Sequence, residues 1–415
     1  MFVRSVVAVL FTAACLHAQT LAIQAGSLID PSKGTVERNQ VILVTDGRIV
    51  NVGPNIPVPE GAQAVDLSKS YVMPGLMDAH VHLTLGAPGE LSLEAEYLKS
   101  SSAMRTLKGL RNARDILMAG FTAVRDLGND MNYIVTDIRR SLEQGWFAGP
   151  SIVASGKIIG PFGGQSHDLS PEVGRFWHYE YIDADTPDEV RKAVRQNIFY
   201  GAGVIKLVAD NSPYTYSQEE MRAAVEEAHR AGLKVAVHVL SDAPARDAVL
   251  AGVDSIEHGF QLSDDVLQLM KQKGTVLVST DIPVEQLRLM GTAGGIFPPP
   301  EETGASILDR LKRAHRIGVK LAFGTDTVLE MPGRTRADMM LDYLGVWQKA
   351  GIPAAKTLRC MTTEVADLFG WTGRRGAIAS GEAADIIAMP ANPLDDIQSL
   401  RRVHFVMKDG KIVRQ

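Results

Sequence analysis

The chain has 415 residues, of which 45% are hydrophobic, and a formal net charge of -5 at pH 7. A chain of this length can bury a large core, and it fits one large barrel with a smaller satellite domain. It contains no block of Lys and Arg, so it has no electrostatic footprint for nucleic acid or an anionic membrane surface. The expected partner is a small-molecule or peptide substrate, and the composition leaves a homo-oligomer open.

The N-terminus has the pattern of a secretory signal peptide. Arg4 supplies an early positive charge, the apolar run that follows is too short to cross a bilayer, and Ala18 is a small residue at the candidate cleavage point. The alternatives are a buried first strand and a lipoprotein signal at Cys15. We expect a signal peptide over residues 1–18, no membrane span, and a periplasmic or secreted protein. Cys360 would then be the only cysteine, which excludes an intrachain disulfide.

Both ends of the mature chain show short alternating strands. Residues 21–53 contain several, separated by turn dipeptides such as Asp46-Gly47, and residues 403–413 repeat the pattern. We therefore expect the two ends to meet in one small β-sandwich. The predicted division is a β-sandwich of residues 19–72 and 378–415 around a barrel of residues 73–377.

Between these ends, buried-type strands alternate with segments of helical period, which predicts an α/β fold of the (β/α)₈ TIM barrel class. Several predicted helices end at a glycine suited to a left-handed cap, such as Gly252. Residues 291–303 form one long irregular insertion and are a candidate lid. The predicted strands span residues 76–83, 121–127, 151–159, 204–209, 235–239, 254–258, 275–280 and 319–325. The predicted helices span residues 105–118, 187–200, 217–231, 243–251, 264–273 and 307–317.

Metal-ligand residue types lie at the ends of these strands. His80 and His82 form a His-x-His pair, and alternate residues of a strand project from one face, so both imidazoles can reach one ion. Any one of these histidines alone would more often be a core or solvated residue. Their shared position at the strand ends, where the active sites of barrel enzymes assemble, favours metal binding instead. The full candidate set is His80, His82, Lys206, His238, His258 and Asp326, a donor mix that suits zinc or a similar ion.

Lys206 interrupts an apolar strand, although lysine is rarely buried without a partner. From the residues alone, the interpretation is a buried ion pair with a nearby acid. The family resemblance described next implies another: reaction of the amine with carbon dioxide to give a carbamate, an anionic oxygen donor.

Five segments carry a family likeness: MPGLMDAHVH at 73–82, GFTAVRDLG at 120–128, SIEHG at 255–259, FGTD at 323–326 and GEAAD at 381–385. Together they resemble the amidohydrolase superfamily, specifically its imidazolonepropionase-like and Xaa-Pro or Xaa-basic dipeptidase branch. The resemblance implies a (β/α)₈ barrel with a flanking β-sandwich and two divalent metal ions.

Transferred to the matching positions of this chain, the resemblance implies that His80, His82 and Asp326 bind the buried ion. It further implies that His238 and His258 bind the exposed ion and that N6-carboxylated Lys206 bridges the two ions. It also implies that a metal-bridging hydroxide attacks the amide carbonyl. Asp326 would act as general base and then acid.

The candidate catalytic residues are Asp326, His258 and His167. Relatives often have Gly-Gly-His, whose histidine contacts the scissile carbonyl, where this chain has Gly163-Gly164-Gln165. Either Gln165 or His167 takes that role, and we favour His167. Leu240 stands where dipeptidase relatives tend to have tyrosine, so a substrate carboxylate is bound differently or is absent, which favours an apolar or aromatic acyl group.

The predicted function is an exported binuclear amidohydrolase or metallopeptidase, with zinc as the expected metal, that hydrolyses the amide bond of dipeptides or N-acyl amino acids. The alternative is a cyclic-amide hydrolase or deaminase, imidazolonepropionase-like, on the same site. A non-catalytic binding protein would be expected to have lost ligands, and all six candidates are present.

Overall fold

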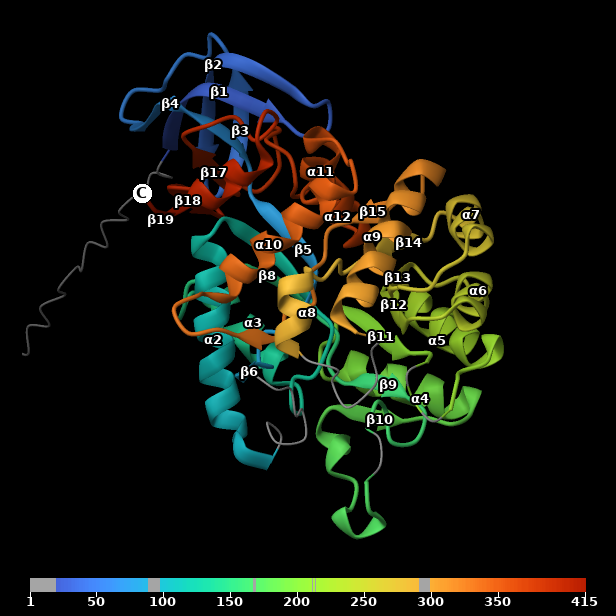
Figure 1. The fold of residues 1–415 in the computed structure, drawn as a ribbon. Coiled ribbons are helices and arrows are strands. Elements are labelled where there is room, and N and C mark those ends of the chain that lie inside the picture. Colours follow the sequence, from blue (N-terminus) through green and yellow to red (C-terminus); the bar gives the residue numbers. More distant parts are fainter. Residues whose placement is uncertain (1–19, 89–97, 167–168, 211, 213, 291–298) are drawn as a thin grey trace, which may run out of the picture.

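The computed structural model describes residues 20–88, 98–166, 169–210, 212, 214–290 and 299–415. Figure 1 shows a small sheet at the top of the view and a larger α/β unit below it, whose strands are surrounded by helices. Strand β5 begins directly after the small sheet and leads into the larger unit. Within the described ranges, no helix combines the length and the apolar character that crossing a bilayer requires.

Both chain ends contribute strands to the small sheet, whose order is β19-β18-β17-β4-β1-β2-β3. Instead of the expected sandwich of two sheets, it is one continuous sheet that curls on itself: Ile49 N–H donates to Glu382 O (2.9 Å) and Gly381 N–H donates to Ile49 O (2.8 Å). Twist accumulated along its long strands brings the two regions together. The strands are β1 (Thr20–Asp30), β2 (Thr35–Thr45), β3 (Arg48–Gly53), β4 (Gln63–Pro74), β17 (Ile386–Met389), β18 (Phe405–Lys408) and β19 (Lys411–Arg414).

The larger unit is built from parallel strands in two hydrogen-bonded groups, β5-β7-β8 and β10-β9-β11-β12-β13-β14-β15. Backbone bonds link the groups at both junctions: Gly203 N–H donates to Ala154 O (2.7 Å), and Ala79 N–H donates to Phe323 O (2.8 Å). The result is a TIM-barrel-like α/β fold. Its strands are β5 (Leu76–Val81), β7 (Phe121–Asp126), β8 (Ser151–Ala154), β9 (Ile158–Gly160), β10 (Tyr181–Asp183), β11 (Val204–Val208), β12 (Lys234–Val239), β13 (Ser255–His258), β14 (Val276–Val278) and β15 (Leu321–Ala322).

Helices cover the outside of these strands. They are α2 (Ser102–Met118), α3 (Ile134–Glu143), α4 (Pro187–Phe199), α5 (Gln218–Arg230), α6 (Asp242–Ala251), α7 (Asp264–Lys273), α8 (Val284–Met290), α9 (Pro300–Ile317), α10 (Arg336–Lys349), α11 (Ala354–Cys360) and α12 (Thr363–Leu368). The predicted cap at Gly252 is confirmed, because this residue ends α6 with φ 93°.

The structure corrects three sequence predictions. The single strand expected over 151–159 is two strands, β8 and β9, because the chain turns at Gly156 with φ 67°. The irregular insertion expected over 291–303 ends earlier, since α9 begins at Pro300, which is well suited to the first turn of a helix; residues 291–298 lie outside the described part of the chain. Helices α3, α8, α10, α11 and α12 were not expected.

The amino-terminal end of the barrel is filled by apolar side chains. Phe369 and Trp371 pack against Val153 and Val204 from two barrel strands. Their own rings meet edge to face, with centroids 5.2 Å apart. The carboxyl ends of the strands, by contrast, carry polar side chains, and these form the site described next.

Candidate metal centre

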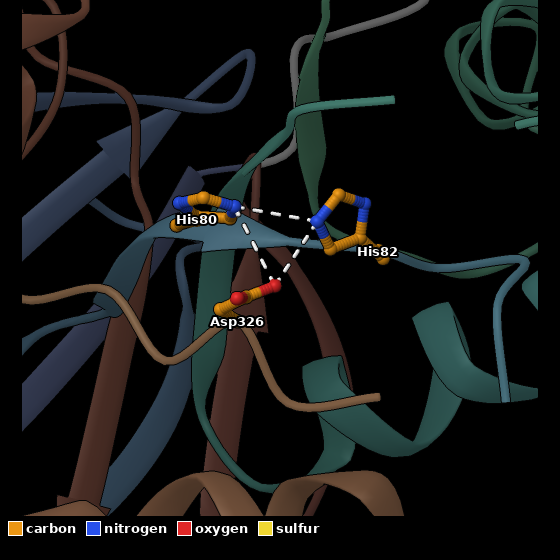
Figure 2. A group of neighbouring side chains, drawn as sticks. All are labelled: His80, His82 and Asp326. Atoms are coloured by element: carbon orange, nitrogen blue, oxygen red, sulfur yellow. Dashed lines mark hydrogen bonds and ion pairs between the residues drawn. The ribbon is translucent and has the colours of Figure 1, made fainter. Parts of the chain in front are cut away.

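Three predicted ligands converge in the interior at the carboxyl end of β5. His82 Nε2 lies 3.0 Å from Asp326 Oδ1, His80 Nε2 lies 3.5 Å from the same oxygen, and the two imidazole nitrogens are 3.3 Å apart. Figure 2 shows both rings and the carboxylate directed at a common point. The ligand atoms of these three residues all lie within 4.8 Å of one another, so the group could hold a metal ion.

The backbone explains why these side chains meet. His80 and His82 are two positions apart at the end of β5 and therefore leave the same face. Asp326 follows the last barrel strand, and its N–H donates to His80 O over 2.7 Å, which ties the two segments together. Asp326 and His258 have φ of 52° and 70°, values that non-glycine residues adopt rarely.

The remaining predicted ligands surround this group. His258 Nδ1 lies 3.7 Å from Asp326 Oδ2, and its ring centroid is 4.3 Å from that of His238. Lys206 is on β11, next to β12, which carries His238. All six residues that the sequence pointed to as metal ligands are therefore gathered around one part of the barrel interior.

Burial determines the protonation of the imidazoles. Desolvation, with the charge of Lys206 as a further cause, holds the pKa of His80, His238 and His258 well below the usual value. These rings are therefore neutral at pH 7 and present the lone pairs that a metal requires. Burial is the largest single effect on His82 and acts to lower its pKa. The hydrogen bond to Asp326, the negative charges of Asp326 and Asp126 and the hydrogen bond to the Gly128 carbonyl together outweigh it, so the pKa of His82 is raised.

Lys206 is 2% exposed, and its Nζ has no hydrogen-bond partner among the described residues. Desolvation lowers its pKa from 10.5 to about 8. An ion pair, the simpler interpretation, would need an acceptor in contact, and the described chain provides none within hydrogen-bond distance. A partly neutral amine beside four imidazoles and a carboxylate is a donor set that fits divalent metal and carbamate formation.

A second group of side chains orients the imidazoles and was missed by sequence reasoning. Glu257 Oε2 lies 2.8 Å from His80 Nδ1, and Arg125 Nη2 donates to Glu257 Oε1 over 2.8 Å. Thr280 Oγ1 lies 2.9 Å from His258 Nδ1. The sequence did carry a signal for two of these residues, because Arg125 and Glu257 are charged residues within otherwise apolar strands. In the structure each is 1% or less exposed.

The region proposed to contact the substrate carbonyl is described only in part. Gln165 Nε2 lies 3.4 Å from His238 Nε2, and Tyr181 Oη donates to Gln165 Oε1 over 3.0 Å. His167, the preferred candidate from the sequence, lies outside the described residues. Leu240 N–H donates to Asp210 Oδ1 over 2.9 Å, so this backbone donor is already engaged.

Comparisons with known proteins agree with this geometry. The profile of the "Amidohydrolase family" matches residues 71–413. Ochratoxinase from Aspergillus niger is 28% identical over 96% of this chain and 87% of its own length. The crystal structure of a Xaa-Pro dipeptidase with bound methionine in the active site has a TM-score of 0.84 and 30% identity, covering 96% of this chain and 100% of its own. A 5-methylthioadenosine/S-adenosylhomocysteine deaminase from Symbiobacterium thermophilum is 27% identical over 90% of this chain and 86% of its own length.

Proposed function

Because the chain belongs to the amidohydrolase family and is a hydrolase acting on C–N bonds, we propose that it is an exported binuclear metalloenzyme that hydrolyses the amide bond of dipeptides or N-acyl amino acids. The observation that carries the proposal is the convergence of His80, His82 and Asp326 in the part of the barrel that also holds Lys206, whose amine has no hydrogen-bond partner among the residues that the structure describes.

Two divalent ions, zinc in our proposal, are assigned to this centre. His80, His82 and Asp326 would hold one ion, His238 and His258 would hold the other, and Lys206 as an N6-carbamate would supply an oxygen donor to both. The carbamate forms when the neutral amine adds to carbon dioxide and releases one proton. Bound ions would supply an activated water and stabilise negative charge on the substrate oxygen.

The catalytic side chains act around these donors. Asp326 has 22% of its side chain exposed, more than its partners His80 and His82, so among the three it is the best placed to exchange a proton with a substrate. It takes a proton from the attacking water and delivers it to the leaving nitrogen. His258 contributes through its contact with the Asp326 carboxylate, which is 3.7 Å away.

We assign the contact with the scissile carbonyl to Gln165, a change from the sequence prediction, which favoured His167. Its amide is oriented by Tyr181, which donates to Oε1, and its Nε2 is thereby directed toward His238. An amide N–H₂ donor can stabilise the oxygen that becomes negatively charged in acyl transfer. His167 is the alternative for this role.

The proposed substrate class rests on Leu240 and on the relatives. A Xaa-Pro dipeptidase of similar fold binds methionine in its active site, which supports an amino-acid leaving group here. Leu240 offers no side-chain donor for a carboxylate, which supports an apolar or aromatic acyl group. A deaminase or cyclic-amide hydrolase is the second candidate, supported by the deaminase that is 27% identical to this chain.

The remaining parts of the proposal concern organisation and location. Residues 1–18 are proposed to be a signal peptide that directs the enzyme to the periplasm or the medium. Residues 19–72 and 378–415 form the small β-domain, and residues 73–377 form a closed (β/α)₈ barrel. The hydrogen bonds at both junctions of the parallel strands support closure.

The test is a substrate panel with the purified mature protein. Metal is first removed from the protein and zinc is then restored, and the zinc content per chain is measured. Turnover is assayed with Xaa-Pro, Xaa-Lys and Xaa-Phe dipeptides, N-acyl amino acids, hydantoin and imidazolone rings, and methylthioadenosine. We expect about two zinc ions per chain and turnover of linear amides. Turnover of rings or nucleosides alone would reject the dipeptidase and acylase assignment.

A further inference from the structure

A cavity of about 780 Å³ lies between the small sheet and the larger unit. Its walls come from the β2–β3 turn, α3, the start of β8, residues 371–375 and the β18–β19 hairpin. Ser151 and Ile152 line it at the amino end of β8, whereas the metal-ligand cluster is at the carboxyl ends of the strands. The cavity is therefore separate from the proposed active site, and its volume is within the range of small-ligand sites.

Two of the cations in this cavity are neutralised by nearby acids. Arg375 Nη1 lies 2.5 Å from Asp385 Oδ2, and its Nη2 lies 2.7 Å from Asp409 Oδ1. Lys408 Nζ lies 3.1 Å from Asp385 Oδ1. Two cations and two carboxylates thus form a balanced cluster beneath one wall of the cavity.

The other cations exceed the acids that face them. Among the described residues that line the cavity, four basic side chains remain, and the remaining acids are Asp46 and Glu143. Glu143 is 64% exposed and lies 3.8 Å from Arg139 Nε, which is too long for a hydrogen bond. The four basic residues are Arg48, Arg139, Arg374 and Lys411.

Within the described chain, three of these four side chains donate hydrogen bonds only to a backbone carbonyl. Arg48 donates to Gly381 O (2.8 Å), Arg139 to Gly201 O (3.0 Å) and Arg374 to Gly370 O (2.9 Å). Each guanidinium carries five N–H groups, so most of its donors are left for another acceptor.

One wall is aromatic, which adds apolar contact to the excess positive charge. Trp371 lines the cavity, and the guanidinium carbon of Arg375 lies 5.9 Å from the centroid of its ring. Guanidinium groups favour carboxylates and phosphates because two parallel N–H donors match two oxygens.

We propose that this cavity is a binding site for a small organic anion with two or more charges, a polycarboxylate or a phosphate ester. The ligand would contact the small sheet through Arg48 and Lys411 and the larger unit through Arg139 and Arg374. It would therefore stabilise the two parts against separation, since a ligand that binds only the folded state raises its stability.

Calorimetric titration of the full mature chain tests the proposal with citrate and, separately, with inorganic phosphate. Sodium chloride at equal ionic strength controls for screening. We expect saturable binding with one site per chain and a raised Tm. Binding of citrate alone identifies the class as a polycarboxylate, binding of phosphate alone identifies it as a phosphate compound, and an absence of saturable binding with both would overturn the proposal.

Charge-neutralising variants locate the binding. The double variant Arg374→Gln and Lys411→Gln changes two exposed side chains and should weaken binding about tenfold or more. Arg402→Gln removes a charge from an exposed residue that does not line the cavity and should leave binding unchanged. Equal weakening in both variants would contradict the assigned site. Since binding is read without turnover, failure here is distinguishable from failure of the proposed enzymatic function.

Discussion

Glu257 Oε2 lies 2.8 Å from His80 Nδ1, and both side chains are 1% or less exposed. The carboxylate accepts a hydrogen bond from the Nδ1–H of His80, which leaves the Nε2 lone pair free to face Asp326 and His82. Arg125 holds the other oxygen of Glu257 over 2.8 Å, so the acceptor itself has a fixed orientation. Glu257 is therefore a positioning residue for the ring that we assign to a metal ion.

Glu257→Gln should lower zinc affinity about 10- to 100-fold, because loss of an outer partner of a ligating imidazole typically has this effect. Competition with a chelator measures the affinity. The matched control is Glu180→Gln, since Glu180 is another buried acid paired with arginine, 2.6 Å from Arg105 Nη1. Unchanged zinc affinity in the Glu257 variant would remove the positioning role.

Lys206→Ala should reduce the metal content by at least one ion per chain, because it deletes the proposed bridging donor. Added acetate or propionate should restore part of the metal content by supplying a carboxylate in the vacated space. Lys157→Ala is the control, since the ammonium of this part-buried lysine already donates to His178 O over 2.6 Å. Full metal content without added acid would contradict the carbamate.

The rate at which zinc restores activity to the metal-free enzyme should depend on pH through Lys206. Burial lowers the pKa of Lys206 to about 8, and only the neutral amine adds to carbon dioxide. At constant dissolved carbon dioxide, recovery of activity in zinc should speed up about tenfold per pH unit below this pKa and level off above it. A plateau reached only near the ordinary lysine value of 10.5 would show that the amine is not perturbed.

Asp326→Asn should retain bound metal but lower kcat by about three orders of magnitude or more, because an amide cannot carry the proton to the leaving nitrogen. Metal counting beside single-turnover kinetics separates the two effects. Near-normal kcat in a metal-loaded variant would exclude Asp326 as the acid and base.

Gln165→Ala should lower kcat about 10²- to 10³-fold with little change in metal content, as expected for loss of one donor to the developing oxyanion. Tyr181→Phe should have a smaller effect in the same direction, because Tyr181 only orients the amide. If His167→Ala alone lowers kcat, the carbonyl contact belongs to His167 instead.

Much of the candidate site could be predicted from local patterns. Side chains alternate between the two faces of a strand, so His80 and His82 lie on the same face regardless of the rest of the fold. The positions of His238 and His258 at strand ends follow from the short apolar runs that precede them. Lys206 was identifiable because a charge within an apolar strand needs a special environment. These inferences depend only on the strand period and on the face at which parallel strands end.

The partners of these residues were decided by tertiary structure. Glu257 and His80 are 177 positions apart, and their contact depends on the order and register of β5, β7 and β13, which no local pattern contains. The same holds for Tyr181 and Gln165 and for the cationic cavity, whose side chains come from separate segments. Backbone periodicity sets the direction in which a side chain points, but only packing of distant segments determines what it meets.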